Sequence, residues 1–384
     1  MIKLIKFTIL IIIFSSLLGP SVKLPLDLPP INVYLPDVFI FLLFLLIALN
    51  YRQTVKIVKN DKPAKILGIF FAYSLITLIF TPINLTRFEF LVSLLYLLRF
   101  CLYFSLYIGC LYLIKAKNGK NLSLYLNLSA ILFIILGWMQ YFLYPDLRNL
   151  EYLGWDPHYG RIFALIFDPN YLGLIIVMGF LVRHTMRKLN FKELAIQLIF
   201  LTTVMFTYSR SSYLALISAV LYYALKIKKF VSYLVISLAV VLSLLLLPRS
   251  GGASVQLERL FSIQERLSNW QSAAYIITTH PYFGVGFNTL RFARRAIGNL
   301  PENWLTSHSA AGVDNSFLFL AATTGIIGLV IFLYLLISIF KQSDLTGKVT
   351  VIAVCVHSFF LNSLFFNFIL IWFWSILALT KKEK

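Results

Sequence analysis

Charged side chains are scarce in this sequence, and acidic side chains are the scarcest. Aspartate and glutamate supply 15 of the 384 residues, and all charged residues together supply 13%, whereas hydrophobic residues supply 60%. The mean hydropathy is +0.84. A soluble domain of this length needs more polar surface than this, so the composition excludes one and predicts a polytopic membrane protein.

Cysteine is almost absent, and so are the common motifs of metal and nucleotide sites. Cys101, Cys110 and Cys355 all fall inside apolar runs, where we interpret them as packing residues rather than as disulfide partners or metal ligands. The sequence has no P-loop, no H-E-x-x-H, no G-x-S-x-G, no Cys/His metal spacing and no paired D-x-D. We therefore expect neither a metal ion nor a cofactor.

Long apolar runs predict an all-α fold of about twelve membrane-spanning helices, in a single membrane domain covering residues 1–384. Such a helix needs about 20 residues to cross the hydrocarbon core. The first run follows two lysines as in a signal peptide, but no A-x-A-like cleavage site follows it, so we expect an uncleaved span. The expected spans cover residues 4–18, 34–50, 66–82, 90–114, 122–144, 170–182, 194–208, 213–226, 230–247, 315–340, 349–364 and 366–380.

Lysines and arginines sort onto opposite sides of these spans. One side has 19 of the 20 lysines, all but Lys23, and the other has 10 of the 14 arginines, between Arg87 and Arg295. The lysine excess follows the positive-inside rule and predicts a bacterial cytoplasmic membrane protein with both termini in the cytoplasm. The net charge of +19 then orients the chain against anionic lipid, and we expect no nucleic-acid partner. Arginine suits bidentate binding of phosphate or carboxylate, so the external arginines indicate an anionic substrate.

Two external connections are long enough to carry function, a moderate loop at 145–170 and a long loop at 248–314. In the long loop, apolar residues at helical spacing predict an amphipathic helix over 255–279 on the outer membrane face, followed by a glycine-containing turn at 283–287. The apolar positions are Leu257, Leu260, Phe261, Ile263, Leu267, Trp270, Ala274 and Ile277.

Four polar or glycine-containing elements are spaced through residues 160–335. They are R-I-F-A-L-I-F-D-P-N-Y from Arg161 to Tyr171, Ser209-Arg210 before an apolar span, Arg266 with Trp270, Ala273 and P-Y-F-G-V-G-F at 281–287, and Asp314-Asn315 with G-I-I-G-L at 325–329. Their order and spacing resemble the O-antigen polymerase and O-antigen ligase superfamily. Residues 1–150 are similar to it only in hydropathy.

This resemblance implies a membrane glycosyltransferase whose donor is a glycan on a polyprenyl pyrophosphate at the outer leaflet. Arg161, Arg210 and Arg266 would bind the pyrophosphate, and Asp314 or His308 would act at the acceptor hydroxyl. The lack of a D-x-D motif favours this lipid-linked donor, without a metal ion, over a nucleotide sugar. The implied partners are the lipid-linked oligosaccharide, the bilayer, and a chain-length regulator and flippase of the same pathway.

Three functions remain open at this point. Superfamily ligases usually have histidine-asparagine where this chain has Asp314-Asn315, whereas polymerases more often have aspartate-asparagine. The sequence therefore favours polymerisation of the repeat units of an O-antigen, capsule or exopolysaccharide over ligation of the finished glycan to a lipid core or another acceptor. A transporter or flippase is a more distant alternative, because the polar features gather at the external surface rather than at the membrane midplane.

The site residues also have structural interpretations. Arg210 suits a snorkelling anchor at a helix end, and His308 suits an ordinary loop histidine. Asp314, or Ser316 in its place, suits the N-cap of the following span. The sequence leaves these alternatives open.

Four further arginines lie outside the expected site. Arg291, Arg294 and Arg295 fall on one helical side, where we expect contact with anionic headgroups. Arg99 lies near the middle of a span, where a charge costs at least ~3 kcal/mol, so it should face the bundle interior. The conceivable partners of Arg99 are Asp37, Glu89 and His357.

Overall fold

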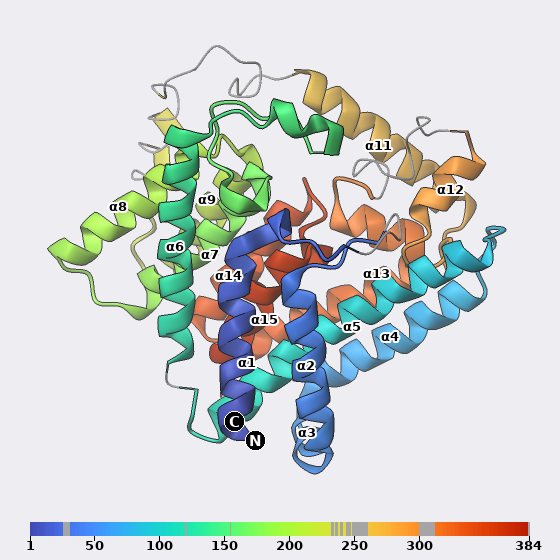
Figure 1. The fold of residues 1–384 in the computed structure, drawn as a ribbon, viewed down its shortest axis with the longest axis horizontal. Helices are drawn as coiled ribbons and strands as arrows, with labels where there is room; N and C mark the ends of the chain where they lie inside the picture. Colours follow the sequence, from blue (N-terminus) through green and yellow to red (C-terminus); the bar gives the residue numbers. More distant parts are fainter. Residues whose placement is uncertain are drawn as a thin grey trace.

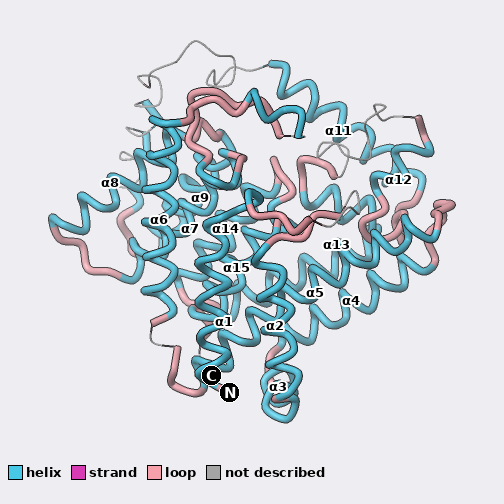
Figure 2. Tube along the Cα trace, viewed as in Figure 1, coloured by secondary structure: helices cyan, strands magenta, loops and turns pink. Residues whose placement is uncertain are grey.

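The computed structural model is an all-helical bundle (Figure 1). It describes residues 1–25, 31–119, 121–153, 155–231, 260–298 and 312–382, with a few single positions between 234 and 247. Figure 2 shows helices and loops, and no strand, in this described part of the chain. The α-helices are α1 (Ile2–Ser15), α2 (Leu35–Leu49), α3 (Tyr51–Lys59), α4 (Lys62–Ile79), α5 (Arg87–Lys115), α6 (Leu122–Leu143), α7 (Pro169–Met186), α8 (Phe191–Phe206), α9 (Arg210–Lys226), α11 (Leu260–Thr279), α12 (Leu290–Ala296), α13 (Ser316–Gln342), α14 (Leu345–Ser358) and α15 (Asn367–Leu379). The short 3-10 helices are η1 (Ser16–Ser21), η2 (Arg148–Leu153), η3 (Ala164–Ile166) and η5 (Ser363–Phe365).

Every expected span except 230–247 overlaps one of these helices, so the all-α prediction is confirmed for the described residues. Among the described residues, five helices are long and apolar enough to cross a membrane: α1 with η1, α4, α5, α6 and α13. A sixth is added if α2 and α3, which are bent by 94° at their junction, form one span. The remaining helices are shorter or less apolar, so the structure does not establish the count of twelve. Span 230–247 lies mostly outside the described residues.

Side-chain caps fix where the helices nearest the candidate site begin. Asp168 accepts hydrogen bonds from the first backbone N–H groups of α7, and Ser209 does the same for α9. Asn315 caps α13 by accepting from two N–H groups of its first turn. The interpretation of Asp314 or Ser316 as this cap was therefore wrong, because Asn315, which lies between them, occupies the position. The carboxylate of Asp314 is thereby left for other contacts.

A break in α13 joins two motifs that lie far apart in the sequence. Gly325 has φ +65° and ψ −175°, which interrupts the helix. The N–H groups of Val285 and Gly286 donate to two carbonyls that the break frees, at 3.0 and 2.9 Å, and the first N–H after the break donates to the carbonyl of Pro281 at 2.8 Å. A Cβ atom on Gly325 would lie 2.1 Å from the carbonyl oxygen of Tyr282. The glycines of the two motifs thus form one interlocked turn.

α11 confirms a helix over residues 260–279 of the expected 255–279 range, and its buried face differs from the expected one. Ala273 and Ile276 are buried, whereas Leu267 and Ala274, two members of the predicted apolar stripe, are exposed. The helix packs against α13 through the face that carries Ser272 and Ala273. Small side chains allow this close approach. Packing against α13, rather than the predicted apolar stripe, therefore determines which face of α11 is buried.

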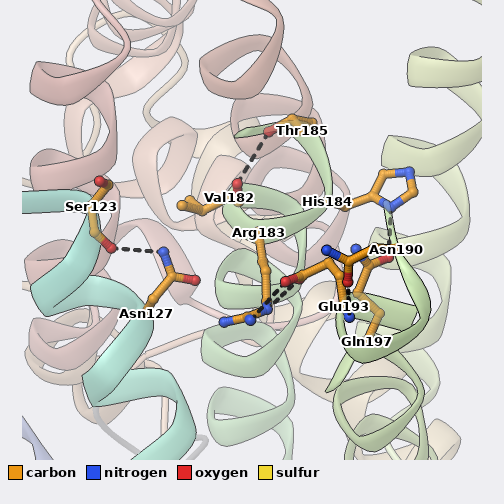
Figure 3. A network of polar contacts seen from close by, with 9 residues as sticks. All are labelled: Ser123, Asn127, Val182, Arg183, His184, Thr185, Asn190, Glu193 and Gln197. Atoms are coloured by element: carbon orange, nitrogen blue, oxygen red, sulfur yellow. Dashed lines mark hydrogen bonds and ion pairs between the residues drawn. The ribbon is translucent and has the colours of Figure 1, made fainter. Parts of the chain in front are cut away.

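The polar groups at the far ends of these helices pair with one another. Arg183, in the last turn of α7, forms a two-point ion pair with Glu193 of α8, and both side chains are buried (Figure 3). Beside them a ring nitrogen of His184 hydrogen bonds to Gln197 at 2.8 Å. Both chain termini lie at one end of the bundle, opposite α11 and α12 (Figure 1).

The interior of the bundle is apolar and aromatic, with α15 passing through its centre. Trp372 and Trp374 are almost completely buried there. Cys110 is buried beside this core, and Cys101 and Cys355 are partly buried. All three cysteines are free, as expected for packing residues.

Candidate functional site

A cavity of about 290 Å³ lies between α5, α7, α12, α13 and α15. Its walls combine aromatic rings with two arginines and three aspartates. The charged and amide side chains in its lining are Arg99, Arg291, Asp156, Asp168, Asp314, Asn288, Asn362 and Asn367. Ligand pockets start at about 300 Å³, so this cavity has room for a small part of a larger substrate.

Asp314 is the predicted catalytic residue that lines this cavity. Its carboxylate pairs with Arg266 of α11 at 3.6 Å between Nε and Oδ2, and the two side chains are 41% and 23% exposed. The indole N–H of Trp270 donates to the backbone carbonyl of Asp314 at 3.3 Å. Arg266 and Trp270 are four residues apart and so share one face of α11. The R-x-x-x-W spacing thus supplies two contacts to the same aspartate.

Arg210 is the first residue of α9 and directly follows a tight turn. Tyr208 in this turn has φ +50°, and Ser209 caps the helix. The guanidinium of Arg210 lies within electrostatic reach of Arg266. The structure therefore brings Arg210, Arg266 and Asp314 into one neighbourhood, at the N-terminal ends of α9 and α13.

Arg161 lies apart from the cavity lining and is 1% exposed. Its Nε donates to the carbonyl of Thr207 at 2.7 Å, and its terminal nitrogens lie 3.4 Å from His158 Nδ1 and 3.3 Å from Asn170 Oδ1. These contacts join the chain before α7 to the turn that presents Arg210. Arg161 thus holds the turn that precedes Arg210 and does not itself line the cavity.

A buried histidine connects the same elements, and the sequence did not assign it there. His357 Nε2 lies 3.1 Å from both Ser211 Oγ and the carbonyl oxygen of Asn170, and Nδ1 lies 2.6 Å from Ser363 Oγ. His357, one of the three conceivable partners of Arg99, is therefore engaged elsewhere. The only sequence signal was a polar residue inside a span, which does not identify a partner.

Arg99 faces the bundle interior, as expected, and Asp37 is its partner. Arg99 Nε donates to Asp37 Oδ1 at 2.9 Å, and a second guanidinium nitrogen contacts the other carboxylate oxygen. The hydroxyl of Tyr103 donates to Asp37 at 2.7 Å, and the ring of Tyr34 lies 5.4 Å from the guanidinium. Glu89, also considered, pairs with an arginine of α12 instead.

The headgroup interpretation is wrong for two arginines of α12, because both are buried. Arg291 is 8% exposed and lines the cavity, and burial lowers the pKa of its guanidinium, with a smaller opposing effect from Tyr96. It stays charged because the ordinary pKa of arginine is far above neutrality. Arg294 is 7% exposed and donates to Asn269 Oδ1 at 2.9 Å and to the carbonyl of Gly312 at 3.4 Å. Arg294 therefore links α11 to the segment that ends in Asp314.

His308, the alternative residue for the acceptor hydroxyl, lies outside the described residues. Within the described ranges, no three histidine, cysteine, aspartate or glutamate side chains gather as a metal site requires.

An all-helical bundle with several membrane-length apolar helices and a charged cavity defines an integral membrane protein with a polar site. Residues 195–333 match the family model described as O-antigen ligase. The match contains Arg210, Arg266 and Asp314, and Arg161 lies before it. It supports the superfamily that the motifs indicated, and with it an O-antigen ligase or polymerase type of membrane enzyme in polysaccharide biosynthesis. No curated protein matches the chain.

Proposed function

We propose that the protein polymerises lipid-linked repeat units of a surface polysaccharide on the outer face of the bacterial cytoplasmic membrane. The observation that carries this proposal is the Arg266–Asp314 pair at the edge of the cavity, with Arg210 beside it. The two arginines can hold an anionic leaving group, and the carboxylate can accept a proton, which are the two needs of the reaction.

In the proposed reaction, a hydroxyl oxygen of the acceptor unit attacks the anomeric carbon of the donor glycan. The bond between that carbon and the pyrophosphate oxygen breaks, and the polyprenyl pyrophosphate leaves with the bonding electrons. Asp314 takes the proton of the attacking hydroxyl, and Arg210 and Arg266 hold the charge that develops on the leaving group. Arg161 holds the turn before Arg210 through the carbonyl of Thr207 and adds positive charge behind the site.

The ion pair also suggests an order of events. Arg266 is paired with Asp314 at the long distance of 3.6 Å. A pyrophosphate with two or more negative charges competes for Arg266 and draws it away from the carboxylate. Asp314 would then act as a base only when the donor is bound.

Polymerisation is preferred over ligation because of the Asp314-Asn315 pair, where ligases of the superfamily usually have histidine-asparagine. Deleting the gene separates the two. A single repeat unit on the final acceptor identifies a polymerase, and long chains retained on the polyprenyl carrier identify a ligase.

The decisive experiment uses purified protein and lipid-linked repeat units, without ATP or an ion gradient. We expect chain extension, and we expect it to survive chelation of divalent metals. Arg210→Lys and Arg266→Lys should each lower the rate by about 10²–10³, because a lysine keeps the charge but loses the two-point contact. Arg148→Lys is the matched control, since that arginine is exposed and pairs with Asp146 in the outer loop. Chain extension at the normal rate in both test variants would contradict the pyrophosphate site.

A further inference from the structure

A hydrogen-bond network around His357 joins the two helix N-termini that carry the proposed site. His357 is fully buried and lies in the last turn of α14, which packs along α9. Its Nε2 atom lies 3.1 Å from the hydroxyl oxygen of Ser211, the residue that follows Arg210. Its Nδ1 atom lies 2.6 Å from the hydroxyl oxygen of Ser363 in η5. The imidazole ring therefore contacts the first turn of α9 on one side and η5 on the other.

The 3-10 helix η5 is in turn tied to the first residue of α13. The hydroxyl of Ser316 accepts from the N–H of Leu364 at 3.2 Å and donates to the carbonyl of Leu361 at 3.2 Å. Ser316 lies two positions after Asp314. One network of hydrogen bonds thus runs from the start of α9, through the ring of His357 and η5, to the start of α13.

The partners of the ring decide which of its nitrogens carries a proton. The carbonyl oxygen of Asn170 lies 3.1 Å from Nε2 and can only accept, so Nε2 is protonated. A buried charge is costly unless it is paired, so the buried ring of His357 is neutral, and Nδ1 accepts from the hydroxyl of Ser363. A protonated Nε2 does not take the proton of Ser211. This geometry therefore excludes His357 as a base for that serine.

The contact between the ring and Ser211 extends to the residue that caps α9. Ser211 Oγ lies 3.1 Å from Ser209 Oγ, and Ser209 caps the helix. The hydroxyl of Ser212 donates to Ser209 at 2.9 Å and lies 3.4 Å from Nε2 of His357. All three serines are buried, where a lost hydrogen bond is costly. The ring thus holds the backbone on both sides of Arg210.

We propose that His357 is a positioning residue, which holds Arg210 at a fixed place relative to Asp314 without touching the substrate. This inference rests on the proposed function, because it assigns His357 a part in that reaction. His357 lies outside the cavity lining and after the segment that matches the family model. A displacement of about 1 Å in a catalytic group can lower a rate by about 10²-fold, so a residue that acts only through Arg210 can have a large effect.

The first test is a double-mutant cycle between His357→Leu and Arg210→Lys, with rates divided by the folded fraction. We expect His357→Leu alone to lower kcat by about 10- to 10²-fold and to leave the KM for the acceptor unchanged. In the Arg210→Lys protein it should have little further effect, because the two-point contact that His357 positions is already lost. His184→Leu is the matched control, since this histidine binds Gln197 at the other end of α7. Its effect should be the same in both backgrounds.

The second test uses the two nitrogens of the ring. A glutamine side chain can place an amide N–H near the position of Nε2, whereas an asparagine reaches only the position of Nδ1. We expect His357→Gln to keep most of the rate and His357→Asn to lose as much as His357→Leu. The reason is that the donor to Ser211 and Asn170 is the contact that fixes Arg210. Equal rates per folded molecule in the two variants overturn the inference.

The outcomes separate this inference from the proposed function. Additive effects of His357→Leu and Arg210→Lys overturn the positioning role, while chain extension by the native protein continues. Failure of the native protein to extend its substrate contradicts the proposed function instead. The same cycle is then measured as binding of farnesyl pyrophosphate, a short polyprenyl pyrophosphate. Weaker binding in His357→Leu that disappears in the Arg210→Lys background supports the inference, and unchanged binding overturns it.

A milder variant keeps the cycle informative if His357→Leu does not fold. Ser363→Ala removes the hydrogen bond to Nδ1 but leaves the ring in place. We expect a smaller loss of kcat than for His357→Leu, with the same dependence on Arg210. A loss that is equal in the native and Arg210→Lys backgrounds overturns the positioning role.

Discussion

The two ends of the helical bundle hold their arginines in different ways. At the far end of α7, Arg183 and Glu193 are only 6% and 7% exposed and make two contacts with each other. At the other end, Arg266 and Asp314 make one contact at 3.6 Å and remain partly exposed. The first pair is closed to solvent within the protein, whereas the second pair is open to solvent, as the proposed site requires.

The difference in burial explains what each pair can do. Removing one partner of a buried pair leaves an uncompensated charge in a medium of low dielectric constant, which is strongly destabilising. A partly exposed pair is screened by water, so its loss costs the fold little. The fold therefore depends on keeping both partners of the closed pair, whereas it tolerates a change in the open pair. Substitutions that remove one carboxylate from each pair test this comparison of the two ends.

The largest effect is expected for Asp314→Asn. Loss of a general base typically lowers the rate by about 10²–10⁴, whereas loss of a long, half-exposed ion pair should change the free energy of unfolding by less than about 1 kcal/mol. Chain extension and unfolding in detergent are measured on the same preparation. A large loss of stability with the rate per folded molecule retained would show that Asp314 is structural.

Glu193→Gln should show the reverse pattern. The charge of Arg183 is then buried without its carboxylate, and we expect the free energy of unfolding to fall by about 3–5 kcal/mol. The rate of extension per folded molecule should stay normal, because the pair lies at the opposite end of α7. Asp146→Asn is the control, since it breaks an exposed pair with Arg148 and should leave the unfolding midpoint unchanged. Similar unfolding midpoints for the two variants would refute the contrast between closed and open pairs.

A smaller loss is expected for Gly325→Ala, which disturbs the backbone that carries the open end. Its φ of +65° and the carbonyl of Tyr282 leave no room for a Cβ atom, so we expect a cost of about 1–3 kcal/mol and reduced extension. Gly68→Ala is matched to it, because Gly68 lies inside α4 with no atom near its Cβ position. That substitution should be neutral or slightly stabilising. Equal effects at the two glycines would show that the break in α13 is not required.

The sequence predicted the helices well because apolar runs leave few alternatives in a membrane. The spacing of the motifs also identified Arg210, Arg266 and Asp314 as candidate site residues, and the fold brings these three residues close together. It did not predict that Arg291 is buried in a cavity wall, because the side of a short loop helix that faces inward depends on the glycine turn and on α13. Likewise, three adjacent polar residues can each cap a helix, and only the fold selects Asn315.

The broken helix α13 also bears on how deep the site lies in the bilayer. From Ile326 to Gln342 the helix has 17 residues (342 − 325), which span about 25 Å at 1.5 Å per residue. The hydrocarbon core is about 30 Å thick, so a helix anchored by Lys341 at one surface reaches its break about 5 Å before the other. Irregular backbone at that depth must have its hydrogen bonds satisfied by protein, as the glycine turn does here. The glycine turn that is hydrogen bonded to this break would then lie below the headgroups, where water does not replace its hydrogen bonds.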